Sequence, residues 1–126
     1  MKEIKEQIQK WTQLLPTGKV VTAIEAERRA SEFLVANAHI AEWIHLFKDG
    51  KIKSESMKVG VYATEMNNCP SKQVTEKKAM AEASESYLKV REEFEFIEND
   101  ISYLKAFQEI FNNGHIFYRN ISRENS

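Results

Sequence analysis

The chain has 126 residues, of which 42% are apolar and 29% charged, and its formal net charge is −1. This length predicts a single folded domain, and the composition differs from that of disordered chains. The small net charge argues against a strongly basic nucleic-acid binder, because phosphate contacts need a surplus of lysine and arginine on some face.

The two prolines and four glycines fall in short clusters separated by long uninterrupted stretches. This predicts an all-α fold, a helical hairpin or bundle with a few long helices. The N-terminus lacks the apolar core of a signal peptide. No apolar run approaches the roughly 18 residues of a membrane span. The sequence therefore predicts a cytoplasmic protein, in which the single cysteine, Cys69, has no internal disulfide partner.

A first short helix is expected over residues 2–15, where apolar residues recur at steps of four, three and four: Ile4, Ile8, Trp11 and Leu15. Pro16-Thr17-Gly18 is expected to end it. A second helix is expected over residues 22–48, because Thr22 and Glu25 fit a capping box. Its heptad stripe consists of Ala23, Ala26, Ala30, Phe33, Asn37, Ile40, Ile44 and Phe47. Asp49-Gly50 is a turn signal that should end this helix.

Residues 51–66 leave two alternatives open. Val59, Val61 and Ala63 alternate as in a short strand, whereas Ile52, Val59, Ala63 and Met66 suit a helix. The pattern favours helix. A loop should follow over residues 67–71.

The strongest pattern predicts a long helix over residues 75–112, extending to about residue 121 if the same steps continue. Its apolar seam steps by three and four without interruption from Met80 to Phe111. A helix from Thr75 to Asn112 would span about 57 Å at about 1.5 Å per residue, which exceeds the width of a compact domain of this size. We therefore expect coiled-coil-like self-association into a homo-oligomer. The expected interface residues are Val90, Phe94, Ile97, Ile101, Leu104, Gln108 and Phe111.

Candidates for catalysis are weak. His39, His45 and His115 have no recognisable ligand spacing, although Asp49 lies one turn from His45. No phosphate-binding glycine loop, nucleophile motif or cysteine cluster occurs. The sequence thus predicts no enzyme, no cofactor and no metal site. The polar seam residues Asn37 and Gln108 are expected to fix register or oligomer state.

Basic residues gather in the middle of the chain, where nucleic acid could bind: Lys48, Lys51, Lys53, Lys58, Lys72, Lys77 and Lys78. Trp43 and Tyr62 bracket the first group and could stack on bases, as aromatic residues do in single-strand binders. Residues 82–100 are instead acidic. That segment could engage a basic partner protein or mimic a polyanion.

The sequence resembles the UvsY-type phage recombination mediators, which are small helical proteins that form rings and help load a recombinase on single-stranded DNA. The resemblance rests on Tyr87-Leu88-Lys89-Val90 and on Asn112-Asn113-Gly114, together with the apolar run through Ile101, Tyr103 and Leu104 and with Ile116 and Ile121. It also includes residues 57–62, which are similar to the basic DNA-contact stretch of the family.

Within that stretch Lys58 matches a family lysine, whereas Gly60 stands where the family has a second basic residue. Gly114 follows Asn113 where an arginine would be usual. The resemblance implies a phage accessory protein of DNA recombination or replication that binds single-stranded DNA and a recombinase. The alternative is a helical adaptor or inhibitor that binds another protein and no nucleic acid.

Overall fold

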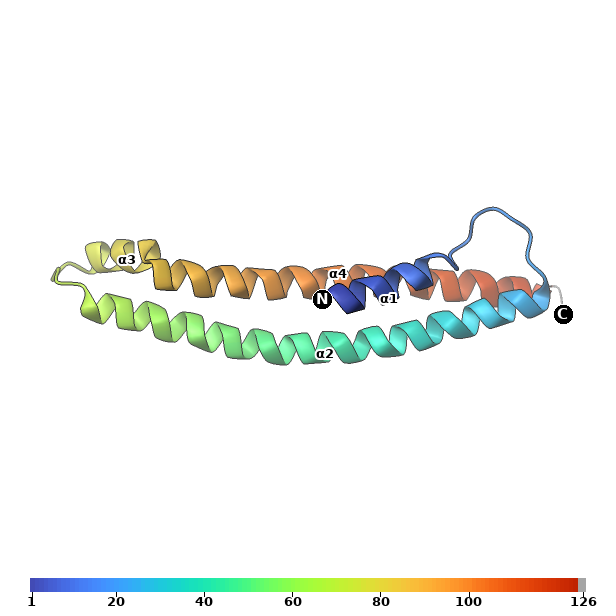
Figure 1. The fold of residues 1–126 in the computed structure, drawn as a ribbon, viewed down its shortest axis with the longest axis horizontal. Helices are drawn as coiled ribbons and strands as arrows, with labels where there is room; N and C mark the ends of the chain where they lie inside the picture. Colours follow the sequence, from blue (N-terminus) through green and yellow to red (C-terminus); the bar gives the residue numbers. More distant parts are fainter. Residues whose placement is uncertain (125–126) are drawn as a thin grey trace. The chain divides into compact units, whose positions relative to one another are not determined.

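The computed structural model describes residues 1–124, which form four helices and no strand. The helices are α1 (Lys2–Thr12), α2 (Ala23–Asn68), α3 (Val74–Ala83) and α4 (Glu85–Glu124), and their course is drawn in Figure 1. The predicted all-α fold with a long C-terminal helix is confirmed. Within residues 1–124 no helix combines the length and apolarity that a membrane crossing requires.

Two compact units divide the described chain, and α2 and α4 contribute to both. Unit 1 comprises Met1–His45 and the chain from Ser102 onward, and unit 2 comprises Leu46–Ile101. The length of the chain had predicted one domain.

Helix α2 is longer than predicted, because Asp49-Gly50 does not end it. The prediction of a turn at Asp49-Gly50 is wrong, and residues 51–66 are helical. A glycine inside a helix costs only about 1 kcal/mol relative to alanine and keeps its backbone hydrogen bonds. The helix therefore continues from the buried face that ends at Ile44 to half-buried residues such as Val61 and Tyr62. At the start of α2, the Thr22 hydroxyl accepts a hydrogen bond from the backbone N–H of Glu25 at 3.1 Å, as expected of a cap.

The long C-terminal helix is interrupted once, at Ser84, where the sequence predicted none. Ser84 has an extended backbone with φ −65° and ψ 142°. Its hydroxyl accepts a hydrogen bond from the backbone N–H of Tyr87 at 3.2 Å, so the serine caps α4. Beyond this break α4 continues through Asn112-Asn113-Gly114 to Glu124.

Unit 1 is a three-helix arrangement with an aromatic centre. The Phe33 ring of α2 stacks on Phe111 and Tyr118 of α4, with ring centroids 5.4 and 6.1 Å apart. From α1, Trp11 meets Phe111 edge to face at 6.1 Å. A Cβ atom at Gly114 would lie 3.0 Å from Cε2 of Phe33, so the glycine permits the close approach of α2 and α4.

Arg29 joins three segments of unit 1. Its guanidinium donates to the Tyr118 hydroxyl at 2.9 Å and to the carboxylate of Glu25 at 2.9 Å. A longer contact of 3.5 Å reaches the carbonyl oxygen of Leu14, in the turn after α1. A single planar fork thus ties the loop after α1 to α2 and α4.

Unit 2 pairs the second part of α2 with α3 and the first part of α4. Its buried side chains are Cys69, Ala81, Val90, Phe94 and Ile101. In unit 1 the buried set is larger: Ile8, Trp11, Ala26, Ala30, Phe33, Ala36, Ile40, Ile44, Leu104, Phe111 and Tyr118.

The apolar seam of α4 is largely covered inside the chain. Val90, Phe94 and Ile101 are buried within unit 2, and Leu104 and Phe111 within unit 1. Ile97 and Gln108 are half-buried. The argument that a second copy must cover this seam therefore fails, because helices of the same chain do so. Self-association stays a prediction.

Candidate functional site

The predicted basic residues all lie in unit 2 but do not form one face. Lys48, Lys51, Lys53 and Lys58 are on α2. At about 100° per residue, Lys51 and Lys58 share one side of the helix, whereas Lys53 lies about 200° away from Lys51. Of the remaining lysines, Lys77 and Lys78 lie on α3, and Lys72 precedes α3. The predicted surface is thus divided.

Lys51 and Lys58 both approach an aromatic ring of α4. The Lys58 ammonium lies 4.2 Å from the centroid of the Phe94 ring, and that of Lys51 lies 5.7 Å from it. Lys51 also forms an ion pair with Glu98, with Nζ and Oε2 3.4 Å apart. Ring attraction leaves the ammonium charge of Lys58 intact and holds it in position, whereas Glu98 offsets the charge of Lys51.

Two tyrosines lie near Lys58, on the lining of the same hollow. Lys58, Val59, Tyr62, Glu82 and Tyr87 line a hollow of about 230 Å³. The rings of Tyr62 and Tyr87 are 5.3 Å apart and tilted by 58°. Burial, with smaller contributions from Glu82 and Tyr87, raises the pKa of Tyr62 above 10.0, so its hydroxyl remains a neutral donor. We call these residues the Lys58 hollow.

The basic residues around α3 form a separate group. Lys72 and Lys78 are exposed and Lys77 is half-buried. Just before α3, the Ser71 hydroxyl pairs with the Glu76 carboxylate, which orders the turn that carries Lys72.

Of the histidines considered for catalysis, His115 makes a structural contact between helices. Nδ1 of His115 lies 2.9 Å from the carbonyl oxygen of Ala30, so this nitrogen donates a hydrogen bond to α2. His45 is exposed on α2. No group of three or more His, Cys, Asp or Glu side chains that could hold a metal ion occurs within residues 1–124. Of the two polar seam residues, Asn37 has a buried Oδ1 with no hydrogen-bond partner among residues 1–124, so this atom forms no register-fixing bond there.

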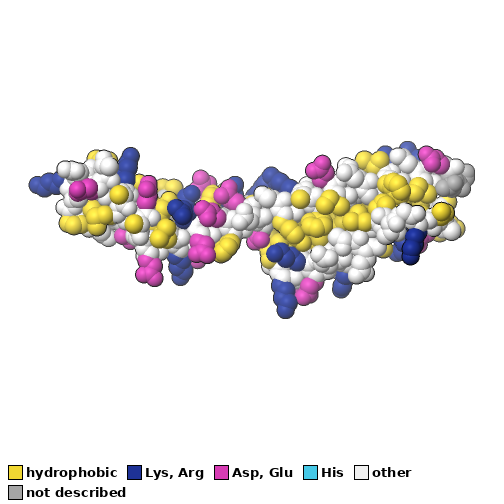
Figure 2. All heavy atoms as spheres, turned by 90° about the horizontal axis from the view of Figure 1, so that it is seen from above, with side chains coloured by type: hydrophobic (Ala, Val, Ile, Leu, Met, Phe, Trp, Pro, Cys, Tyr) yellow, Lys and Arg dark blue, Asp and Glu magenta, His cyan; other side chains and the backbone are white. Residues whose placement is uncertain are grey.

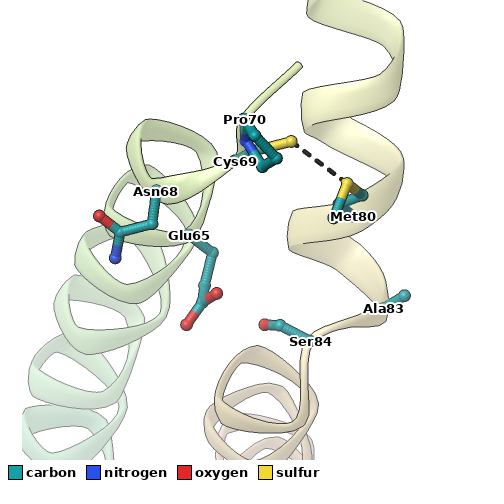
Figure 3. A pocket seen from close by; sticks show the side chains of 7 residues that line it. All are labelled: Glu65, Asn68, Cys69, Pro70, Met80, Ala83 and Ser84. Atoms are coloured by element: carbon teal, nitrogen blue, oxygen red, sulfur yellow. Dashed lines mark hydrogen bonds between the residues drawn. The ribbon is translucent and has the colours of Figure 1, made fainter.

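Two sulfur atoms, one from Cys69 after α2 and one from Met80 of α3, are in contact within unit 2. The Cys69 thiol points at the sulfur of Met80, with Sγ and Sδ 3.2 Å apart (Figure 3). Cys69 and Met80 line a pocket of about 360 Å³, together with Glu65 and Ser84. Two sulfur atoms from one thiol and one thioether provide packing and a weak hydrogen bond.

An aromatic cluster that the sequence did not predict joins α1 to α2 in unit 1. The rings of Trp11, His39 and Trp43 are mutually 5.9 Å apart, with interplanar angles from 23° to 33°. Trp43, expected to act with Tyr62, belongs to this cluster instead. The available signal was the four-residue spacing of His39 and Trp43, which puts both rings on one helix side outside the heptad stripe.

Unit 1 also exposes apolar side chains. On the face shown at the right of Figure 2, apolar side chains form a nearly continuous run, whereas charges of both signs are interspersed over unit 2. Exposed apolar residues of unit 1 include Leu34, Val35, Ile110, Ile116 and Phe117.

Comparisons with protein-family models, with curated proteins and with solved structures found no match for this chain.

Proposed function

We propose that this chain is an accessory protein of DNA recombination or replication that binds single-stranded DNA through unit 2. In this proposal it acts as a homo-oligomer together with a recombinase or another replication protein. The resemblance to UvsY-type mediators supplies the biological role. The observation that carries the proposal is the Lys58 hollow, whose lining includes two tyrosine rings and Lys58, the ammonium of which lies over the Phe94 ring.

This combination suits a strand with unpaired bases. Single-strand binders use cationic side chains along the backbone and aromatic rings on which bases stack, without needing sequence-specific hydrogen bonds. Lys58 provides the cation, and Tyr62 and Tyr87 provide rings. Lys51 lies on the same side of α2 and supplies a second cation when Glu98 is displaced.

The first prediction concerns salt dependence. In a fluorescence polarisation titration with a single-stranded oligonucleotide, Lys51→Ala with Lys58→Ala should reduce the slope of log K against log salt. The expected reduction is about 0.7 for each lost phosphate contact. Tyr62→Leu should instead weaken binding roughly tenfold at unchanged slope, because it removes a stacking ring and no charge.

Lys53→Ala is the matched control, since Lys53 points to another side of the same helix and should leave the slope unchanged. An unchanged slope in the double variant would exclude the Lys58 hollow as the DNA contact. Light scattering on the same samples gives the mass of the particle that binds.

A second candidate function is supported by a different observation. The exposed apolar residues of unit 1, together with the acidic residues of α4 from Glu85 to Asp100, suit a helical adaptor that binds another protein. In the same titration, an adaptor would leave the polarisation of the oligonucleotide unchanged at both low and high salt, whatever its oligomeric mass.

A further inference from the structure

The two halves of helix α2 are packed very differently, although the helix is continuous. Up to His45, the end of its part in unit 1, α2 buries the side chains of Ala26, Ala30, Phe33, Ala36, Ile40 and Ile44. Over residues 46–68, its part in unit 2, no side chain is buried. Most helical stability in proteins comes from packing rather than from helix propensity. The unit 2 part of α2 therefore has less to stabilise it than the unit 1 part.

The neighbouring helices of unit 2 cover residues 46–68 incompletely. Hollows of about 230, 470 and 360 Å³ lie along α2 from Met57 to Asn68, and each is also lined by residues of α3, of α4 or of the break at Ser84 (Figure 3 shows the last of them). A Cβ atom built on Gly60 would meet nothing within 4 Å. Side chains that line an empty space lose their dispersion contacts on that side. Tight packing is thus missing from Met57 onward.

The side-chain contacts between residues 46–68 and α4 are polar or aromatic and stay partly exposed. Lys51 pairs with Glu98, but their side chains are 37% and 44% exposed, so water screens this ion pair. Lys58 lies over the ring of Phe94, and Tyr62 meets Tyr87. In unit 1, by contrast, α2 contributes fully buried side chains to the core. Breaking the contacts of residues 46–68 should therefore cost less free energy than opening unit 1.

We propose that residues 46–68 unfold locally, as one unit, while unit 1 stays folded, and that this opening controls the Lys58 hollow. The hollow combines residues of α2 with Glu82 of α3 and Tyr87 of α4, so it exists only while residues 46–68 are in place. A ligand that binds there binds the closed form alone, and opening and binding exclude each other. The control of the hollow rests on the proposed function, because single-stranded DNA is taken as the ligand. The local unfolding does not depend on it.

Hydrogen exchange of the free chain, followed residue by residue by NMR, tests the local unfolding. Amides of residues 48–64 are compared with those of residues 28–44, ranges that leave out both ends of the helix. We expect residues 48–64 to be at least about tenfold less protected and to share one level of protection. A smaller difference would overturn the inference. A steady decline toward Asn68 would indicate fraying from the helix end and would overturn it as well.

Two variants of α2, one in each unit, test whether the opening is local. Ile40 is fully buried in unit 1, so Ile40→Val should lower the protection of residues 28–44 by about two- to tenfold and leave residues 48–64 unchanged. Gly60→Ala should raise the protection of residues 48–64 by about two- to fivefold, because alanine favours the helix and meets no neighbour there. An equal loss in both ranges for Ile40→Val would show one cooperative unit. That result, or unchanged protection of residues 48–64 in Gly60→Ala, would contradict the local unfolding.

Exchange in the presence of a single-stranded oligonucleotide tests the control of the hollow. At a free strand concentration of about twenty times the Kd from fluorescence polarisation, the protection of residues 48–64 should rise about twentyfold. Rising polarisation without added protection would overturn the control of the hollow and leave DNA binding standing. If polarisation does not rise at all, DNA binding and the control of the hollow both fail, whereas the exchange of the free chain still decides the local unfolding.

Discussion

Gly50 and Gly114 are both helical, yet they stand in opposite surroundings. Nothing lies within 4 Å of a Cβ atom built on Gly50, whereas one built on Gly114 would meet three atoms of the Phe33 ring at 3.0 to 3.3 Å. Phe33 is fully buried and stacked on two other rings, so it has little room to move. The sequence alone gave no means of distinguishing the two glycines.

Alanine substitutions should therefore change stability in opposite directions. Gly50→Ala should stabilise the protein by about 0.5–1 kcal/mol, since alanine loses less backbone entropy in a helix. Gly114→Ala should destabilise it by about 1–3 kcal/mol through overpacking. Urea denaturation measures both. A destabilised Gly50→Ala would indicate a turn at Asp49-Gly50 and contradict the continuous α2.

Glu25 is the residue whose ionisation should be visible in the pH dependence of stability. Hydrogen bonds from Arg28 and then Arg29 lower its pKa from 4.5 to about 2. Because the folded pKa lies below the unfolded one, the stabilisation is fully present above pH 4.5 and is lost as the pH falls toward 2. Glu25→Gln should thus lower the melting temperature near pH 7 by an amount that shrinks to nothing near pH 2. Glu27→Gln controls for the loss of a carboxylate on the same helix, and a pH-independent difference for Glu25→Gln would contradict the assignment.

At the scale of elements, the apolar periodicity predicted where helices occur better than where they end. The heptad stripe of α2 predicted its buried face, from Ala26 to Ile44, because burial and helical period are directly linked. Asp49-Gly50 was misread as an end, since a local preference of about 1 kcal/mol does not by itself end a helix. The break at Ser84 was missed, because serine is a weak signal inside an unbroken seam.

For the candidate site, the sequence predicted the basic segment and Tyr62 but not their partners. Whether Lys51 and Lys58 share a side follows from helical geometry once residues 51–66 are known to be helical. Phe94 lies beside these two lysines, and Tyr87 beside Tyr62, because of the register between α2 and α4. The pattern of a single sequence does not specify that register. Trp11 meets His39 and Trp43 for the same reason: the contact joins residues far apart in the sequence.

At the scale of the whole molecule, the covered seam of α4 determines how stability should depend on concentration. Leu104 is fully buried, and its neighbours in unit 1 come from the same chain. Leu104→Ala should destabilise the protein by about 2–5 kcal/mol, because truncation leaves a cavity. We expect the same loss across about a hundredfold range of protein concentration. Thermal denaturation with light scattering measures it, and a loss confined to dilute samples would restore the seam as an oligomer interface.

Helix α1 has only 11 residues, and an isolated helix of that length is marginal in water. It buries Ile8 and Trp11 against unit 1 and is joined to α2 by a loop in which Val20 is fully exposed and Gly18 has a φ of 82°. Docking and helix formation of α1 are consequently coupled: burial of Ile8 and Trp11 drives both, and the loop keeps the segment at an effective millimolar concentration beside the rest of unit 1. After proteolytic cleavage at Val20, the segment that contains α1 would dissociate as a dilute free peptide and lose its helical structure.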